Sequence, residues 1–281
     1  MAEILNCKPL AAQVRAELET RVLALKERGV TPGLAVIRVG DDPASETYVR
    51  NKERMCQKLG LLSEVLHLPN DTSEKELLSR IDEYNQDARF HGILVQLPLP
   101  KHISEEAALA RIAPEKDVDG ISVSSLGALV RGGDGFLPCT PKGILRILDN
   151  AHIPLRGKRA VVVGRSSIVG KPISLLLLRR DATVTICHSR TENLREITAQ
   201  ADILVAAVGR PAMLDGSYVK EGAAVIDVGI NRTENGLVGD VDFESAAEKA
   251  AYITPVPGGV GLMTVAMLME NTVEAAERAA R

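Results

Sequence analysis

The sequence predicts an α/β protein of two domains, each built on a parallel sheet with helices on its faces. Helical and extended patterns alternate along all 281 residues, a length that provides enough chain for two cores. The alternation restarts near Pro138, after the glycine- and proline-rich stretch VRGGDGFLPCTP, whose composition is typical of a domain boundary.

The first half is expected to hold three strands and three helices before a further helix leads to residue 115. Leu10, Val14, Leu18 and Val22 recur every four residues, which predicts a surface helix near the N-terminus. Thr72 is expected to open a later helix, because acids follow Ser73 in its first turn. The predicted strands are 33–40, 63–69 and 92–100, and the predicted helices between them are 43–59 and 72–87.

The second half repeats the alternation with four strands of one α/β unit. A helix at 140–151 precedes the first of these strands, another begins at Gly170, and a last helix runs from near Met263 to the end. The four predicted strands are 159–164, 183–189, 203–209 and 223–230.

Composition argues against several functional classes. The net charge is −3, aromatic residues make up 2 % of the chain and Trp is absent, so no nucleic-acid partner is expected. The four cysteines form no C-x-x-C pair and the histidines no H-x-x-x-H pair, so we expect reduced thiols and no metal site. We find neither a targeting signal nor an apolar run long enough for a bilayer, so a cytoplasmic protein without membrane association is expected.

The stretch VVVGRSSIVGKP, residues 161–172, predicts a phosphate-binding turn between a strand and a helix. Gly164 permits a tight turn, Gly170 permits close packing of the next helix, and Ser166 can donate a hydrogen bond to a phosphate. The G-x-G-x-x-G fingerprint would place a glycine at Ser166, so an ordinary strand–turn–helix connection is the alternative.

The end of the next predicted strand favours NADP over NAD. An NAD site usually carries an acid about 20 residues after the glycines, where it binds the ribose 2′-hydroxyl. Here the strand ends in CHSRT, with Ser189 and Arg190 and no acid, and Arg165 stands in the first loop. These groups suit a 2′-phosphate. The alternative is that both arginines are solvated surface charges.

Lys52 lies on the apolar face of the predicted helix 43–59. At 100° per residue it shares that arc with Tyr48, Val49 and Cys56, whereas almost every other charged residue falls outside it. A lysine that faces an interior has a lowered pKa and can transfer protons. The alternative is a stem that covers apolar surface while the ammonium group reaches water.

Two further polar residues are candidates to join Lys52. Gln96 interrupts the apolar run GILVQLP at the carboxyl end of its strand, the edge at which open α/β sheets bind ligands. Asp117 and Asp119 lie in the turn EKDVDG, and a structural role in that turn is the alternative for both.

Eight motifs in order resemble the bacterial bifunctional methylenetetrahydrofolate dehydrogenase/methenyltetrahydrofolate cyclohydrolase family, FolD, over essentially the whole chain. They are YVRNK, GILVQLPLP, EKDVDGI, PCTPKG, VVVGRSSIVGKP, VIDVGINR, GDVDF and ITPVPGGVG. The resemblance implies NADP-dependent oxidation of 5,10-methylenetetrahydrofolate, then hydrolysis of the methenyl product to 10-formyltetrahydrofolate. It also implies a homodimer of chains with two α/β domains flanking a cleft. These are a folate-binding domain at 1–139, completed by a returning helix at 263–281, and a Rossmann-like NADP domain at 140–262.

The resemblance assigns roles to individual residues of the folate site. Lys52 is the central catalytic lysine, Gln96 holds and tunes it, Asp119 binds the polar edge of the pterin, and Tyr48 packs on the folate rings. Pro257, Gly258, Gly259 and Leu262 lie in or beside the loop that lines the cleft. Members of the family commonly have proline where this chain has Leu262, so a less rigid loop is expected here.

On the cofactor side, the resemblance assigns Gly164, Arg165 and Ser166 to the nucleotide loop. Ser189 matches the contact to the 2′-phosphate, Ile230 lies near the nicotinamide, and Thr140 also belongs to the cofactor site. Two alternatives stay open at this point. One is a monofunctional NAD(P)-dependent methylenetetrahydrofolate dehydrogenase, and the other is a cofactor-binding regulatory protein without turnover.

Overall fold

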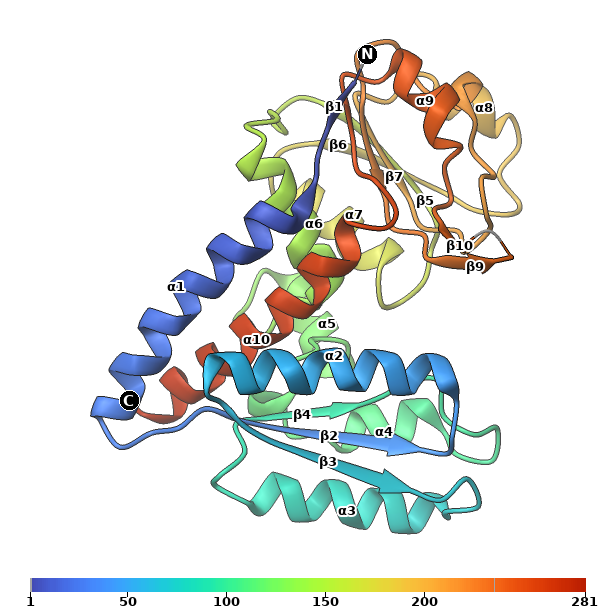
Figure 1. Ribbon diagram of the computed structural model, residues 1–281. Helices are drawn as coiled ribbons and strands as arrows, with labels where there is room; N and C mark the ends of the chain where they lie inside the picture. Colours follow the sequence, from blue (N-terminus) through green and yellow to red (C-terminus); the bar gives the residue numbers. More distant parts are fainter. Residues whose placement is uncertain (1, 235) are drawn as a thin grey trace. The chain divides into compact units, whose positions relative to one another are not determined.

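The computed structural model describes residues 2–234 and 236–281, which form two compact units (Figure 1). The six-stranded unit comprises Met1–Ala12 and Thr140–Thr264, and the three-stranded unit comprises Gln13–Cys139 and Val265–Arg281. Two long helices, α1 (Cys7–Glu27) and α10 (Val260–Ala279), contribute residues to both units.

The three-stranded unit contains a parallel sheet in the order β3–β2–β4 (Leu62–Leu68, Gly33–Val39 and Gly92–Val95). On one face, α3 (Glu74–Gln86) and α4 (Glu105–Arg111) cover a core in which Ile37 and Ile93 are fully buried. Helix α2 (Pro43–Leu59) lies on the opposite side of the sheet from α3 (Figure 1). The unit also contains η1 (Pro114–Lys116) and α5 (Val123–Arg131).

The six-stranded unit contains a parallel sheet in the order β1–β11–β8–β7–β5–β6. These strands are Glu3–Ile4, Tyr252–Ile253, Ala224–Asp227, Ile203–Ala206, Arg159–Val163 and Thr183–Cys187. An antiparallel pair, β9 (Asn231–Thr233) and β10 (Gly236–Val238), follows β8. The helices of this unit are α6 (Cys139–Asn150), α7 (Gly170–Leu178), α8 (Leu194–Thr198), η2 (Gly216–Tyr218) and α9 (Phe243–Lys249).

The predicted α/β class is confirmed, and the structure corrects several of the predicted boundaries. The predicted strands 203–209 and 223–230, for example, end at Ala206 and Asp227. Strand β4 ends at Val95, because prolines at 98 and 100 have no N–H for a ladder, so Gln96 lies just beyond the strand. Ser73 caps α3 in place of Thr72, its hydroxyl accepting from the N–H of Glu76 at 3.2 Å. Helix α10 begins at Val260, before the predicted start near Met263.

No helix within the described ranges is long and apolar enough to span a bilayer.

Candidate functional site

Lys52 and Gln96 meet in the three-stranded unit. Helix α2 buries Val49 and Cys56, and Lys52 lies between them in sequence and is half-buried. Its Nζ donates a hydrogen bond to Oε1 of Gln96 at 2.9 Å. The amide of Gln96 is itself fixed, since Nε2 donates to the carbonyl of Leu97 at 2.7 Å. The sequence-predicted pairing of this lysine and glutamine is therefore present.

Asp119 stands in a turn that a neighbouring carboxylate holds in shape. The buried Asp117 accepts from the N–H groups of Gly120 and Ser122 at 3.1 and 3.0 Å, and from Oγ of Ser125 at 2.6 Å. Asp117 thus has the structural role that the turn pattern allowed, and Asp119 is left half-buried.

A residue that sequence reasoning missed fixes the same turn from the last helix. Asn271, fully buried on α10, donates from Nδ2 to the carbonyls of Val118 and Leu137 at 2.8 and 3.0 Å. The signal in the sequence is a lone asparagine within the apolar run of the last helix. Such a buried amide is stable only where carbonyls receive its protons.

The protonation of Lys52 and Asp119 is mutually dependent. Burial lowers the pKa of Lys52, and the negative charge of Asp119 opposes that effect. Burial likewise raises the pKa of Asp119, while the charge of Lys52 and a hydrogen bond with Cys139 act in the opposite direction. A lysine with a lowered pKa, held by an amide oxygen, gives up its proton more readily than a solvated lysine and can then accept one from water.

We predict that Asp119→Asn lowers the pKa of Lys52 further. The substitution removes the negative charge that favours the ammonium form, so Lys52 loses its proton at a lower pH than in the wild type. NMR of protein labelled at lysine Cε, with Lys52→Met to assign the signal, measures this titration. The exposed acid Glu115 gives the control Glu115→Gln, which leaves the titration unchanged. An unchanged or raised pKa in Asp119→Asn would contradict the electrostatic coupling.

Tyr48 is predicted to lie on the apolar face of α2, but its side chain is exposed. The residue lies one turn before Lys52 on α2 and is 40 % exposed. An exposed aromatic ring beside a half-buried lysine provides a surface for a planar ligand.

The nucleotide-type turn lies at the carboxyl edge of the six-stranded sheet, between β5 and α7. A Cβ on Gly164 would lie 2.2 Å from the carbonyl oxygen of Ala207, and its φ of 133° also favours glycine. A Cβ on Gly170 would meet the carbonyl oxygen of Gly164 at 2.2 Å, as close helix packing requires. Oγ of Ser166 accepts from the N–H groups of Val169 and Gly170, both at 3.2 Å, so its hydroxyl proton is directed elsewhere.

The ends of β5 and β6 are adjacent, and their side chains fit a phosphorylated nucleotide. The N–H of Gly164 donates to the carbonyl of Cys187 at 2.9 Å, which places the 164–170 turn beside residues 188–190. Arg165, Ser189 and Arg190 are exposed at this edge, and residues 188–191 contain no acid. Hydroxyl and guanidinium donors without an opposing carboxylate suit the 2′-phosphate of NADP.

The remaining predicted residues of this unit lie at other points of the fold. Oγ1 of Thr140 and Oγ1 of Thr264 are 2.9 Å apart and share a hydrogen bond. Ile230 is 43 % exposed after β8, and its Cδ1 would lie 3.1 Å from a Cβ on Gly261. Pro257 is exposed, Gly258 is half-buried and Gly259 is buried.

Leu262 lies in the first turn of α10 and not in a loop. Its N–H, which a proline would lack, donates to the carbonyl of Gly259 at 3.1 Å. Compared with a proline at this position, Leu262 therefore adds a hydrogen bond to the segment that was expected to be less rigid. The side chain of Leu262 is 38 % exposed.

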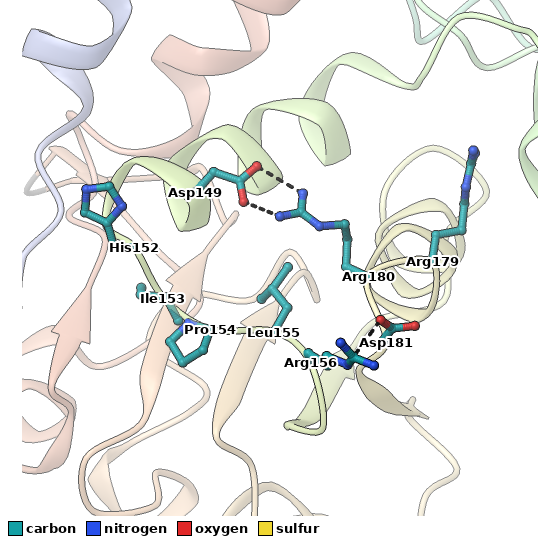
Figure 2. Close-up of a pocket in the computed structure, with 9 residues that line it drawn as sticks. All are labelled: Asp149, His152, Ile153, Pro154, Leu155, Arg156, Arg179, Arg180 and Asp181. Carbon is teal, nitrogen blue, oxygen red and sulfur yellow. Dashed lines mark hydrogen bonds and ion pairs between the residues drawn. The ribbon is translucent and has the colours of Figure 1, made fainter.

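A pocket at the opposite edge of the six-stranded sheet has no predicted site residue in its lining (Figure 2). Its walls are the segments that lead into β5 and β6. Asp149 pairs with both terminal nitrogens of Arg180 at 2.6 and 3.0 Å, and Arg156 lies 3.8 Å from Asp181. Ligands of parallel sheets bind at the carboxyl ends of strands, so this pocket is not the nucleotide site.

Comparison with known proteins gives the family. Residues 5–119 match the catalytic domain of tetrahydrofolate dehydrogenase/cyclohydrolase, and residues 138–280 match its NAD(P)-binding domain. The chain is 60 % identical over 278 residues to the bifunctional protein FolD of Moorella thermoacetica, with 99 % of each chain covered.

Solved structures agree with the sequence comparisons. The bifunctional FolD enzyme of Campylobacter jejuni has a TM-score of 0.98 and 48 % identity, with 99 % of this chain and 100 % of that chain covered. The Trypanosoma brucei enzyme, complexed with NADP cofactor and an inhibitor, has a TM-score of 0.95 and 39 % identity over 100 % of this chain and 99 % of its own. This chain belongs to the tetrahydrofolate dehydrogenase/cyclohydrolase family.

Proposed function

We infer that the chain is a bifunctional one-carbon enzyme. It oxidises 5,10-methylenetetrahydrofolate to the 5,10-methenyl compound with NADP⁺, and then hydrolyses that compound to 10-formyltetrahydrofolate. The observation that carries this inference is the hydrogen bond between Nζ of Lys52 and Oε1 of Gln96. The charge of the same lysine is coupled electrostatically to Asp119. A dehydrogenase without hydrolysis has no need of this proton-transfer group, so the monofunctional alternative is not favoured. The same holds for a regulatory protein without turnover.

NADP is the cofactor. Bound NADP⁺ supplies the nicotinamide ring that accepts a hydride from the methylene carbon of the folate. The protein contributes the 164–166 turn and Ser189 at the carboxyl edge of the sheet, and we propose Ile230 and Thr140 as further contacts. The domain at 140–262 is accordingly proposed to bind NADP, and the domain at 1–139 with the helix 263–281 to bind folate, although β1 at the start of the chain pairs in the six-stranded sheet.

Hydration of the methenyl group needs a base that is not itself a cation. The methenyl compound is positively charged, so an ammonium group beside it would be repelled. Neutral Lys52 accepts a proton as water adds to the methenyl carbon. The carbon–N5 bond then breaks, so that one proton of the water ends on N5 and the other is released. Gln96 keeps the amine oriented through this sequence.

We propose the other folate contacts on the same basis. Asp119 binds the polar edge of the pterin, because a carboxylate can accept hydrogen bonds from its ring N–H and amino groups. Tyr48 stacks on the ring system with its exposed side chain. Pro257, Gly258, Gly259 and Leu262 are proposed to complete the substrate site.

We also propose that the chain acts as a homodimer in the cytoplasm. Strand β6 lies at the end of the sheet order, so one of its hydrogen-bonding edges has no partner strand in the sheet. Ile186 on this strand and Leu178 at the end of α7 are 42 % and 58 % exposed. An open edge beside exposed apolar side chains supports association with a second copy.

We predict that Ser189→Asp weakens NADP⁺ selectively. The new carboxylate would repel the 2′-phosphate, so the KM for NADP⁺ should rise by about tenfold or more. NAD⁺ has no 2′-phosphate, and its KM should change little, which makes it the matched control in the same protein. Steady-state kinetics with both nucleotides measures the difference. A similar rise for both nucleotides would show that Ser189 does not distinguish them.

The hydrolytic half of the function can be tested without any nucleotide. The purified protein is given 5,10-methenyltetrahydrofolate alone, and loss of the methenyl absorbance is compared with a sample without protein. We expect hydrolysis well above the uncatalysed rate. A rate equal to the uncatalysed one would leave a dehydrogenase only.

A further inference from the structure

Two buried aspartates of the six-stranded unit have no role in the mechanism above. Asp227 ends β8 and is 4 % exposed, and Asp240 follows β10 and is fully buried. Neither carboxylate has an ion-pair partner among the described residues. A buried carboxylate is stable only where N–H donors replace its water.

Asp240 binds the segment that follows β7. Its Oδ2 accepts from the N–H groups of Val208 and Gly209 at 2.6 and 2.9 Å, and its Oδ1 accepts from the N–H of Arg210 at 2.9 Å. Nδ2 of Asn231, the first residue of β9, also donates to Oδ1 at 2.9 Å. One carboxylate therefore ties together the segments that follow two neighbouring strands, β7 and β8.

Asp227 completes this arrangement from the other side. It accepts from the N–H groups of Gly229, Asp240 and Val241, each at 2.9 Å. Its own N–H donates to Oγ1 of Thr254 at 2.8 Å, which links the segment after β11. The two carboxylates, Asp227 and Asp240, with the backbone that they bind, are called the aspartate clamp below.

The backbone of the clamp has no room for side chains at two positions. A Cβ on Gly229 would lie 2.3 Å from Oδ1 of Asp240, and a Cβ on Gly239 would lie 1.8 Å from Oδ2 of Asp227. Each carboxylate is thus packed against a glycine next to the residues that it fixes. Ile230, between Gly229 and Asn231, is held from both sides.

We propose that Asp240 is a positioning residue for the nicotinamide end of NADP. It acts through the aspartate clamp, which fixes the segments after β7 and β8 and so sets the place of Ile230. The proposal rests on the proposed function, since it assumes that NADP binds at this carboxyl edge. The donors to Asp240 come from the segments after β7 and β8, which hold no proposed folate contact, so replacing Asp240 should affect NADP binding and not hydrolysis by Lys52.

The variant Asp240→Asn tests the proposal, because asparagine keeps the shape but directs an N–H₂ group at backbone N–H donors. Calorimetric titration with NADP⁺ alone gives the affinity without turnover, and we expect the Kd to rise on the order of tenfold. The KM for NADP⁺ should rise with it. Hydrolysis of 5,10-methenyltetrahydrofolate, measured without nucleotide, should stay near the wild-type rate.

Asp202→Asn is the matched control. Asp202 accepts from the N–H of Arg159 at 2.9 Å, but at the amino edge of the same sheet. The Asp202→Asn substitution should leave the NADP⁺ affinity near the wild-type value. An unchanged Kd in Asp240→Asn, or an equal rise in Asp202→Asn, would overturn the proposal.

A milder variant keeps the test decisive if Asp240→Asn does not fold. Asn231→Ala removes one donor to Asp240 and should raise the Kd for NADP⁺ by a smaller factor, again without loss of hydrolysis. Equal loss of binding and hydrolysis in this variant would show a general structural role and overturn the proposal. If the wild type binds NADP⁺ but catalyses neither reaction, the proposed function fails while the clamp remains testable by binding.

Discussion

Lys52→Met should remove most of the cyclohydrolase activity and a much smaller share of the dehydrogenase activity. The substitution deletes the amine that accepts the proton of water. General acid–base catalysis by such a group contributes about 10²–10⁴-fold to the rate. Hydride transfer needs no proton from Lys52, so any decrease in dehydrogenase activity reflects only poorer positioning of the folate. Methionine is close to lysine in length and adapts to its neighbours, so α2 should still pack on the sheet. Separate assays of NADP⁺ reduction and methenyl hydrolysis measure the two effects.

Lys58→Met is the control for Lys52→Met. Lys58 is exposed in the last turn of the same helix, so its replacement should leave both activities near wild type. Circular dichroism establishes that each variant is folded. Equal loss of both activities in folded Lys52→Met would argue against a separate role for Lys52 in hydration.

Gly164→Ala should abolish NADP⁺ binding and destabilise the six-stranded unit. The new Cβ would lie 2.2 Å from the carbonyl oxygen of Ala207, a backbone atom directly after the neighbouring strand β7. The φ of 133° adds strain on the order of 1–3 kcal/mol for a residue other than glycine. Relief requires the turn to move away from β7, which displaces Ser166 from its place at α7. Calorimetric titration with NADP⁺ and thermal unfolding measure both effects.

Gly157→Ala separates steric overlap from backbone strain. Gly157 lies in the same unit with a φ of 73°, and a Cβ there would have no atom within 4 Å. It should lower stability by about 1 kcal/mol and leave NADP⁺ binding near wild type. If Gly164→Ala binds NADP⁺ as well as Gly157→Ala does, the 164–170 turn is not the phosphate site.

The regular elements could be predicted because long amphipathic helices and buried strands have a strong period. Strand β2 and helices α2 and α6 lie within one residue of their predicted bounds. Strands β1, β9, β10 and β11 were missed, since two or three residues have no period to detect and such short strands exist only through pairing with another segment. The start of α10 was placed late because glycines at 258, 259 and 261 resemble a loop, although Gly261 lies in the first turn of the helix.

The side chains of the candidate site could be predicted from the sequence, but the buried residues that hold its backbone by hydrogen bonds could not. Lys52 was identified because a charge on an apolar face is visible in sequence, and Gln96 because a polar residue ends an apolar run. Asn271 and Asp240 were missed as supports, since each acts on carbonyls or N–H groups more than 25 residues away in the chain. Only folding brings such donors and acceptors together, so the sequence can show a polar residue in an apolar run, as at Asn271, but not the groups that it binds.

The most direct test of the account gives the purified protein 5,10-methylenetetrahydrofolate with NADP⁺ or NAD⁺ and follows reduced nicotinamide and methenyl compound separately. We predict rapid reduction of NADP⁺, little reduction of NAD⁺, and no accumulation of the methenyl compound, because Lys52 allows its hydrolysis. Accumulation of the methenyl compound would contradict the role of Lys52, and a preference for NAD⁺ would contradict the role of Arg165 and Ser189.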